Sequence, residues 1–125
     1  MAGHGTFYWN ELMTRDAKKA REFYGPALGW TFDVMPMPGG LNYYVCKQGD
    51  QAVGGIFEMT GPDLANVPPH WFTYIQVDNV DRRVAAATQA GAKLSRPIFT
   101  VPGIGRIAVI EDPVGAHVGW MTPAS

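Results

Sequence analysis

The sequence predicts an α+β fold in which two βαβββ modules form a cupped mixed β-sheet with helices on its outer face. Three observations predict it: short aromatic or β-branched runs bounded by turn residues, two segments with helical periodicity, and the same element order in both halves. We expect a single domain over residues 1–125. Module one should span about 6–60, a linker about 61–69 and module two about 70–122.

The first module begins with an aromatic-rich run at 7–13 that predicts a strand. Asp16 suits the N-cap of the following helix and Gly29 suits its end, while Gly25-Pro26 should interrupt or kink it. Turn residues then separate short strands at 30–35, 41–46 and 52–59, and the glycines at 54–55 indicate a bulge or a close backbone approach. The buried stripe of the helix is predicted to consist of Ala20, Phe23, Tyr24, Ala27 and Leu28.

The second module repeats this order. A strand is expected at 71–77, then a helix capped by Asp78 or Asn79, then three strands near 93–100, 106–111 and 116–121. A shift of the chain against itself indicates a duplicated unit, because matching residues fall at matching places in the two halves. The shift superposes Trp9 on Trp71, Asp16 on Asp78 and Gly29 on Gly91.

The composition is that of a folded globular protein. Hydrophobic residues make up 46% of the chain and charged residues 17%, and the formal net charge is −1. Lys and Arg never cluster beyond a pair, which argues against nucleic acid and membrane surfaces as partners. We expect a cytoplasmic protein, because the sequence encodes neither a signal peptide nor a membrane span. The single cysteine, Cys46, should fill the core.

Four motifs resemble one superfamily in their order and spacing. They are Glu11-Leu12-Met13-Thr14-x-Asp16, Glu22-Phe23-Tyr24, Leu28-Gly29-Trp30 and Glu111-Asp112-Pro113-x-Gly115. Together they resemble the vicinal-oxygen-chelate superfamily, the group of glyoxalases, bleomycin-resistance proteins and extradiol dioxygenases. The resemblance implies a cupped sheet of paired modules, usually a homodimer, with a ligand inside the cup. In metal-dependent members, His and Glu side chains of the strands hold a divalent cation there.

The resemblance also locates the four metal-ligand positions in this chain, and three of them have lost their ligands. The first falls on Trp9, the third on Phe72, or on Trp71 if the register slips by one, and the last on Gly119. Only the second position, Glu58, keeps a side chain that can bind a cation. We therefore expect no cofactor and no metal at the usual site.

Strand alternation predicts which side chains share the cup with these positions. Aromatic walls with a few polar groups suit a small-molecule pocket, and we expect Trp9, Phe72, Tyr74 and Gln76 to bind the ligand. The predicted lining consists of Phe7, Trp9, Glu11, Met13, Glu58, Phe72, Tyr74, Gln76 and His117.

Three of these residues are candidate catalytic groups. Glu11 is the foremost candidate, because a desolvated carboxylate has a raised pKa that suits a general base. Alternatively, its carboxylate is exposed to water or paired with an arginine such as Arg106. Glu58 is the second, or it only hydrogen-bonds the backbone. His117 could be an acid/base partner of the carboxylates, or a surface residue.

Three functions remain open at this point. The leading hypothesis is a metal-independent protein that binds, and could transform, a small hydrophobic or aromatic metabolite. The first alternative is a divalent-metal-dependent lyase, isomerase or hydroxylase that combines Glu58 with nonstandard ligands such as His117 and Glu11. The second is a resistance-type protein that sequesters its ligand without turnover.

Overall fold

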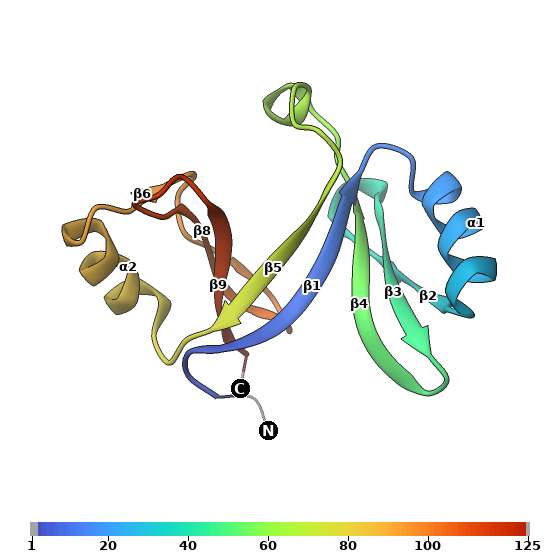
Figure 1. Cartoon of the computed structure of the whole chain (residues 1–125), viewed down its shortest axis with the longest axis horizontal. Coiled ribbons are helices and arrows are strands. Elements are labelled where there is room, and N and C mark those ends of the chain that lie inside the picture. Colours follow the sequence, from blue (N-terminus) through green and yellow to red (C-terminus); the bar gives the residue numbers. More distant parts are fainter. Residues whose placement is uncertain (1–2, 125) are drawn as a thin grey trace. The chain divides into compact units, whose positions relative to one another are not determined.

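The computed structural model describes residues 3–124, so that residues 1–2 and 125 of the predicted domain lie outside the described residues. The described residues form two compact units: unit 1 combines residues 3–9 with 72–124, and unit 2 spans residues 10–71. The boundaries fall within strands β1 and β5 (Figure 1). In chain order the elements are β1 (Thr6–Thr14), α1 (Ala17–Leu28), β2 (Thr31–Pro36), the 3₁₀ turn η1 (Pro38–Gly40), β3 (Asn42–Gln48), β4 (Gln51–Glu58), η2 (Pro62–Leu64), β5 (His70–Gln76), α2 (Val80–Gln89), β6 (Lys93–Leu94), β7 (Phe99–Val101), β8 (Gly105–Glu111) and β9 (His117–Pro123).

The predicted order of strands and helices is confirmed, and so are the signals that start and end the helices. Asp16 caps α1 by accepting a hydrogen bond from the backbone N–H of Lys19. Gly29 ends α1 in the left-handed conformation, with φ of 75°. Of the two caps proposed for α2, the structure uses Asn79, whose side chain accepts from the N–H of Arg82.

In unit 2 the strands are hydrogen-bonded in the order β2-β3-β4-β1. β2, β3 and β4 are antiparallel neighbours, whereas β4 and β1 are parallel. One face of this sheet packs against α1. The core between them contains Leu12, Ala17, Cys46 and Ile56. Cys46 is fully buried, as predicted, and burial raises the pKa of its thiol to about 11.

The glycines at 54–55 mark both a bulge and a close approach, as the sequence predicts. The register of β3 and β4 shifts between Cys46 and Lys47, so that Val53 is left without a partner of its own. A Cβ on Gly54 would lie 2.9 Å from the backbone oxygen of Asn10 in β1. The strands can therefore lie this close only because residue 54 lacks a side chain.

In unit 1, β5 pairs in parallel with β9, β9 is antiparallel to β8, and β8 pairs with both β6 and β7. The core lies between these strands and α2. Two short strands replace the single strand predicted at 93–100, because Pro97 lacks an N–H and cannot continue a ladder. The buried core residues are Val77, Val80, Val84, Ala92, Ala108 and Ile110.

Two predictions about α1 need correction. The helix is not interrupted at Gly25-Pro26 but continues to Leu28, since Pro26 lies in the last turn and removes only one hydrogen bond. The alternative, a kink at this position, stays a prediction. The buried stripe is also narrower than predicted. Ala17, Ala20 and Tyr24 pack on the core, whereas Phe23 and Leu28 are 62% and 50% exposed.

Candidate functional site

The face of the unit 2 sheet that lies opposite α1, here called the helix-free face of unit 2, can be assigned from the strand register. Leu12 and Ile56 are paired and belong to the core beside α1. Their neighbours Glu11 and Gly55, also paired, must point to the other side because successive side chains alternate. The same rule places Tyr43 there, since Tyr43 pairs with Phe57, two residues beyond Gly55.

A buried carboxylate bound to a phenol occupies this face. Glu11 of β1 is only 8% exposed, and the hydroxyl of Tyr43 in β3 donates a hydrogen bond to its Oε1 at 2.8 Å. The sequence predicts that Glu11 points into the cup, away from the helices. Its position on the face opposite α1 agrees with that prediction. Arg106, suggested above as an alternative partner, binds the carboxylate of Asp81 through its guanidinium.

Gly55, which lies between Glu11 and Tyr43, is the feature that lets them meet. An added Cβ on Gly55 would lie 1.8 Å from the hydroxyl oxygen of Tyr43 and 2.3 Å from its Cζ, so no side chain fits there. Sequence reasoning missed Tyr43. Two signals could have found it. Side chains alternate along residues 42–48, and Gly55 lies two residues before Phe57, with which Tyr43 pairs.

Glu58 does not share this face, and its predicted place in the cup was wrong. It pairs with Thr14, which has the same alternation as the core residue Leu12. Its Oε1 accepts a hydrogen bond of 3.1 Å from the N–H of Ala17, the first residue of α1. The carboxylate thus stabilises the positive end of the helix, which agrees with the alternative that Glu58 only hydrogen-bonds the backbone.

Unit 1 has a corresponding helix-free face, opposite α2. The pairing of Tyr74 with Gly119, Gln76 with Met121 and Glu111 with His117 gives these residues a common alternation. The prediction that Phe72, Tyr74, Gln76 and His117 share one face is therefore confirmed. Phe72 and Tyr74 are both 9% exposed, and their rings meet edge to face at 5.1 Å.

A tyrosine also fills the space beside a glycine in unit 1. A Cβ on Gly119 would lie 2.3 Å from Cδ1 of Tyr74 and 3.0 Å from Cε2 of Phe72. The two units therefore use the same device, a side-chain-free position on the helix-free face with a tyrosine lying over it. In unit 2 the tyrosine comes from β3, whereas in unit 1 it comes from the paired residue in β5.

The carboxylate beside His117 is Glu111, a neighbour that sequence reasoning did not assign. Their side chains approach to 3.7 Å between Nε2 and Oε1, and His117 remains 56% exposed. Glu111 pairs directly with His117 across β8 and β9, and that pairing follows from the short turn between these strands. The exposure indicates an accessible imidazole with an adjacent carboxylate.

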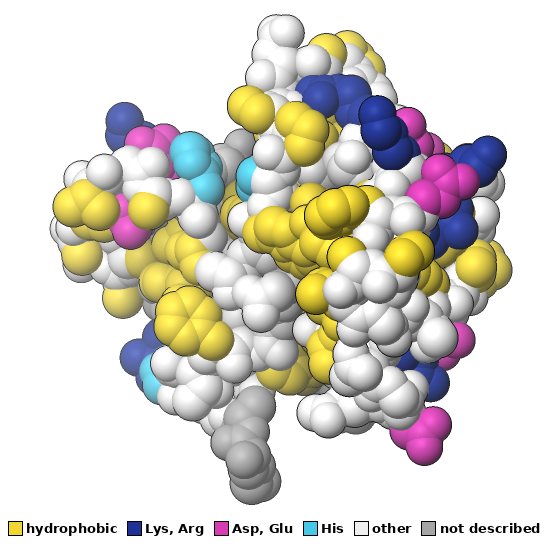
Figure 2. All heavy atoms as spheres, turned by 45° about the vertical axis from the view of Figure 1, so that its right-hand side comes forward, with side chains coloured by type: hydrophobic (Ala, Val, Ile, Leu, Met, Phe, Trp, Pro, Cys, Tyr) yellow, Lys and Arg dark blue, Asp and Glu magenta, His cyan; other side chains and the backbone are white. Residues whose placement is uncertain are grey.

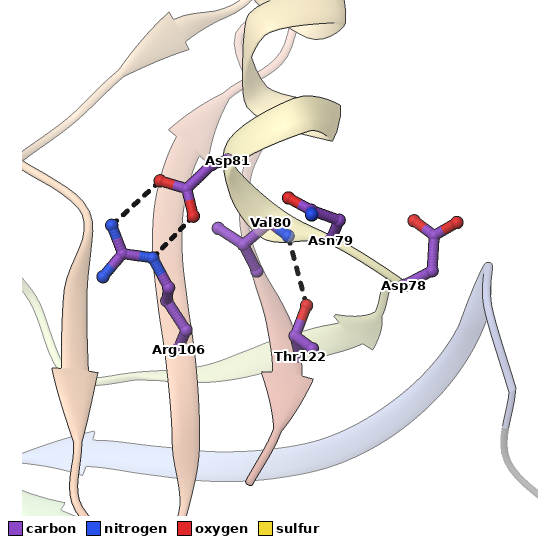
Figure 3. Close-up of a pocket in the computed structure, with 6 residues that line it drawn as sticks. All are labelled: Asp78, Asn79, Val80, Asp81, Arg106 and Thr122. Atoms are coloured by element: carbon purple, nitrogen blue, oxygen red, sulfur yellow. Dashed lines mark hydrogen bonds and ion pairs between the residues drawn. The ribbon is translucent and has the colours of Figure 1, made fainter. Parts of the chain in front are cut away.

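Unit 1 also contains a shallow cavity of about 140 Å³ at the start of α2 (Figure 3). Asp81 faces Arg106 across it, and their ion pair lowers the pKa of Asp81 through a hydrogen bond from Arg106. The N–H of Val80 donates to Oγ1 of Thr122, which itself donates to the carbonyl of Val77. These contacts attach the helix to β9, and we assign the cavity a structural role.

The residues at the positions where the resemblance places metal ligands do not fit a divalent cation. Trp9 and Phe72 offer rings without a suitable lone pair, Glu58 is bound to the start of α1, and the space at Gly119 is occupied by the ring of Tyr74. Within residues 3–124, no group of three or more His, Cys, Asp or Glu side chains lies close enough together to hold a metal ion.

Large hydrophobic side chains remain exposed on α1 and β2, as Phe23, Leu28, Val34 and Met35. Figure 2 shows hydrophobic side chains exposed next to charged side chains. The expected homodimer stays a prediction. None of the helices in the described part of the chain is long and apolar enough to cross a membrane.

Comparison with known proteins agrees with this architecture. The model of the family described as "Glyoxalase/Bleomycin resistance protein/Dioxygenase superfamily" matches residues 6–119. A Mycobacterium tuberculosis protein named "Putative glyoxylase CFP32" is 40% identical over 120 residues, which are 96% of this chain and 45% of that protein. The "Anthracycline biosynthesis protein DnrV" of Streptomyces peucetius is 27% identical over 119 residues, which are 86% of this chain and 43% of that protein. The chain thus spans less than half the length of these curated relatives.

Among solved structures, methylmalonyl-CoA epimerase from Mycobacterium tuberculosis is similar over 100% of this chain and 93% of its own, with a TM-score of 0.68. The sequence identity is 16%, so this likeness concerns the fold alone.

Proposed function

The chain belongs to the glyoxalase/bleomycin resistance protein/dioxygenase superfamily, and on this premise we propose that it binds a small hydrophobic or aromatic metabolite on the helix-free faces of its sheet, without a divalent cation. In this proposal Glu11 is the acid/base residue. On the helix-free face of unit 1, Phe72 and Tyr74 offer their rings to a ligand and Gln76 offers it a hydrogen bond. Trp9, two residues before Glu11 on the same strand, is a further ligand contact.

The observation that carries the proposal is the buried carboxylate of Glu11 with its phenol partner. Burial of a charged group is costly, so a carboxylate that serves only the fold would be expected at the surface. Glu11 is 8% exposed on a face without a helix. A carboxylate in this position can accept a proton from a bound ligand and return it. The relative named for anthracycline biosynthesis accords with a small-molecule ligand.

Two features support a function without a metal. The metal-dependent alternative requires Glu11 and Glu58 to point to the same side, and the register puts them on opposite faces of the sheet. A glutamate could not replace Gly119 unless Tyr74 moved. Elemental analysis of protein purified without chelators tests this directly, and one equivalent of tightly bound Ni, Zn, Fe or Mn would contradict the proposal.

The experiment that tests the ligand proposal is native mass spectrometry of protein purified without denaturation, followed by binding and turnover assays with the co-purified compound. Glu11→Gln should abolish turnover and weaken binding. Glu58→Gln is the matched control, because it removes a carboxylate from the opposite face, and binding should persist. Equal affinity of wild type and Glu11→Gln would contradict the role of Glu11.

The same assay separates catalysis from sequestration. Conversion of the compound by wild-type protein, lost in Glu11→Gln, supports an enzyme. Unchanged recovery of the compound after long incubation would instead show a sequestering protein that uses the same surface.

A further inference from the structure

The contact between Tyr43 and Glu11 resembles the contact that a phenolic ligand would make. The phenol oxygen lies 2.8 Å from Oε1 of a carboxylate that is 8% exposed. A phenol O–H is a good donor to an ionised carboxylate, and such charge-assisted hydrogen bonds are stronger than neutral ones. The chain thus places an aryl hydroxyl of its own on Glu11.

The space that holds this hydroxyl exists because residue 55 is glycine. The oxygen of Tyr43 lies 1.8 Å from the point that a Cβ on Gly55 would occupy, and Cε2 of the ring lies 2.6 Å from it. We call this space, bounded by Glu11 and the backbone of Gly55, the Glu11–Gly55 niche. Its lateral neighbours on the same face are Met13 and Phe57, which are apolar and half-buried. The niche therefore offers a carboxylate and an apolar surface for a ring.

Tyr43 can leave the niche by a rotation of its side chain. Its backbone is part of the ladder with β2 and β4, and rotation about the two side-chain torsions would move the ring away from Gly55 while the ladder stays in place. If a ligand hydroxyl takes its place, Glu11 exchanges one phenolic donor for another and no buried carboxylate is left without a donor. The apolar contacts of the ligand ring then have to outweigh those that the ring of Tyr43 gives up. An anionic ligand group would be repelled by Glu11.

We propose that the Glu11–Gly55 niche recognises the hydroxyl of a neutral phenolic ligand, and that Tyr43 is a specificity-determining residue whose hydroxyl occupies the niche until such a ligand displaces it. This inference rests on the proposed function and narrows its ligand class from aromatic compounds to phenols.

The first experiment removes the internal phenol and supplies it from solution. Tyr43→Ala is titrated by calorimetry with 4-methylphenol, which reproduces the tyrosine side chain, and with toluene, which lacks the hydroxyl. We expect 4-methylphenol to bind at least about tenfold more tightly than toluene, because the hydroxyl restores a hydrogen bond to a charged group. The preference should vanish in the double variant Tyr43→Ala/Glu11→Gln if the charge of Glu11 is its source.

Tyr44→Ala is the matched control. Tyr44 follows Tyr43 on the same strand, but its ring packs at the core beside α1, where the guanidinium of Arg21 lies 4.1 Å from the ring centroid. A cavity at Tyr44 should show no comparable preference for 4-methylphenol over toluene. Circular dichroism confirms that each variant is folded. Equal affinity of a folded Tyr43→Ala for the two probes, or no binding of either, would overturn the inference.

A second experiment leaves the chain intact. Wild-type protein labelled with 3-fluorotyrosine is titrated with 4-methylphenol and followed by fluorine NMR, with Tyr43→Phe identifying the resonance of Tyr43. Displacement predicts a shift of that resonance and none at Tyr44. A saturable titration that leaves the Tyr43 resonance in place would show that Tyr43 does not exchange.

These outcomes are separate from those of the proposed function. If Glu11→Gln abolishes turnover but 4-methylphenol shows no preference, the phenol inference fails and the role of Glu11 stands. If 4-methylphenol is preferred but the co-purified compound binds Glu11→Gln as it binds wild type, the proposed function fails instead.

Discussion

The substitution Gly55→Ala probes the Tyr43–Glu11 contact without touching either residue. The added Cβ would lie 1.8 Å from the hydroxyl oxygen of Tyr43, a separation that real atoms do not tolerate. The phenol must therefore move, because it is the end of a side chain whereas the strand backbone is fixed by its ladders. Glu11 then loses the hydrogen bond that Tyr43 donates.

The expected cost is that of one hydrogen bond to a buried charge, about 1.5–3 kcal/mol of the free energy of unfolding. A smaller gain opposes this cost, since replacing glycine by alanine in a strand stabilises by roughly 0.5–1 kcal/mol. The net effect is destabilisation of about 0.5–2.5 kcal/mol. For a chain of this length, each kcal/mol shifts the melting temperature by about 3–5 °C, so we expect a decrease of about 2–12 °C.

A double-mutant cycle isolates the steric cause. Urea unfolding is measured for wild type, Gly55→Ala, Tyr43→Ala and the double variant. In the Tyr43→Ala background the obstacle is absent, so Gly55→Ala should be neutral or stabilising. If Gly55→Ala costs the same in both backgrounds, the cost does not come from Tyr43 and the proposed geometry of the niche is refuted.

Three further predictions concern other parts of the chain. Burial raises the pKa of Cys46 to about 11, so only about one thiol in a thousand is ionised at pH 8. A thiol reagent should therefore label the native chain very slowly and the urea-unfolded chain at once. Rapid labelling of the native chain would contradict this prediction. Gly119→Ala should lower the free energy of unfolding by about 1–3 kcal/mol, because the added methyl group clashes with Tyr74. In urea titrations this loss should disappear when Tyr74 is also replaced by alanine. An equal loss with Tyr74 and with alanine at position 74 would exclude the clash as its cause. Arg15 donates hydrogen bonds to three backbone carbonyls of the segment 61–69. Limited proteolysis should therefore cut this segment faster in Arg15→Gln than in wild type. Equal cleavage rates would show that these hydrogen bonds do not restrain the segment.

Local interactions explain why much of the fold could be predicted. The caps of α1 depend on Asp16 and Gly29, whose preferences act over a few residues, and the duplication is visible because both modules repeat those signals. The break at Pro97 was missed because two short strands and one longer strand have the same apolar pattern. The continuation of α1 through Pro26 was missed because a helix near its end tolerates the loss of one hydrogen bond.

The sequence by itself determined that the chain has paired βαβββ modules and that Phe72, Tyr74 and Gln76 alternate together along one strand. Through the resemblance it also predicted that three metal-ligand positions have lost their ligands. Only the tertiary structure decided which residues of neighbouring strands share a face. The offset between strands depends on hydrogen-bonded register and on the irregularity at Val53, and a slip of one residue reverses every side chain. For this reason Glu58 lies at the start of α1, where it accepts a hydrogen bond from the N–H of Ala17. Tyr43, which alternation alone did not single out, donates a hydrogen bond to Glu11.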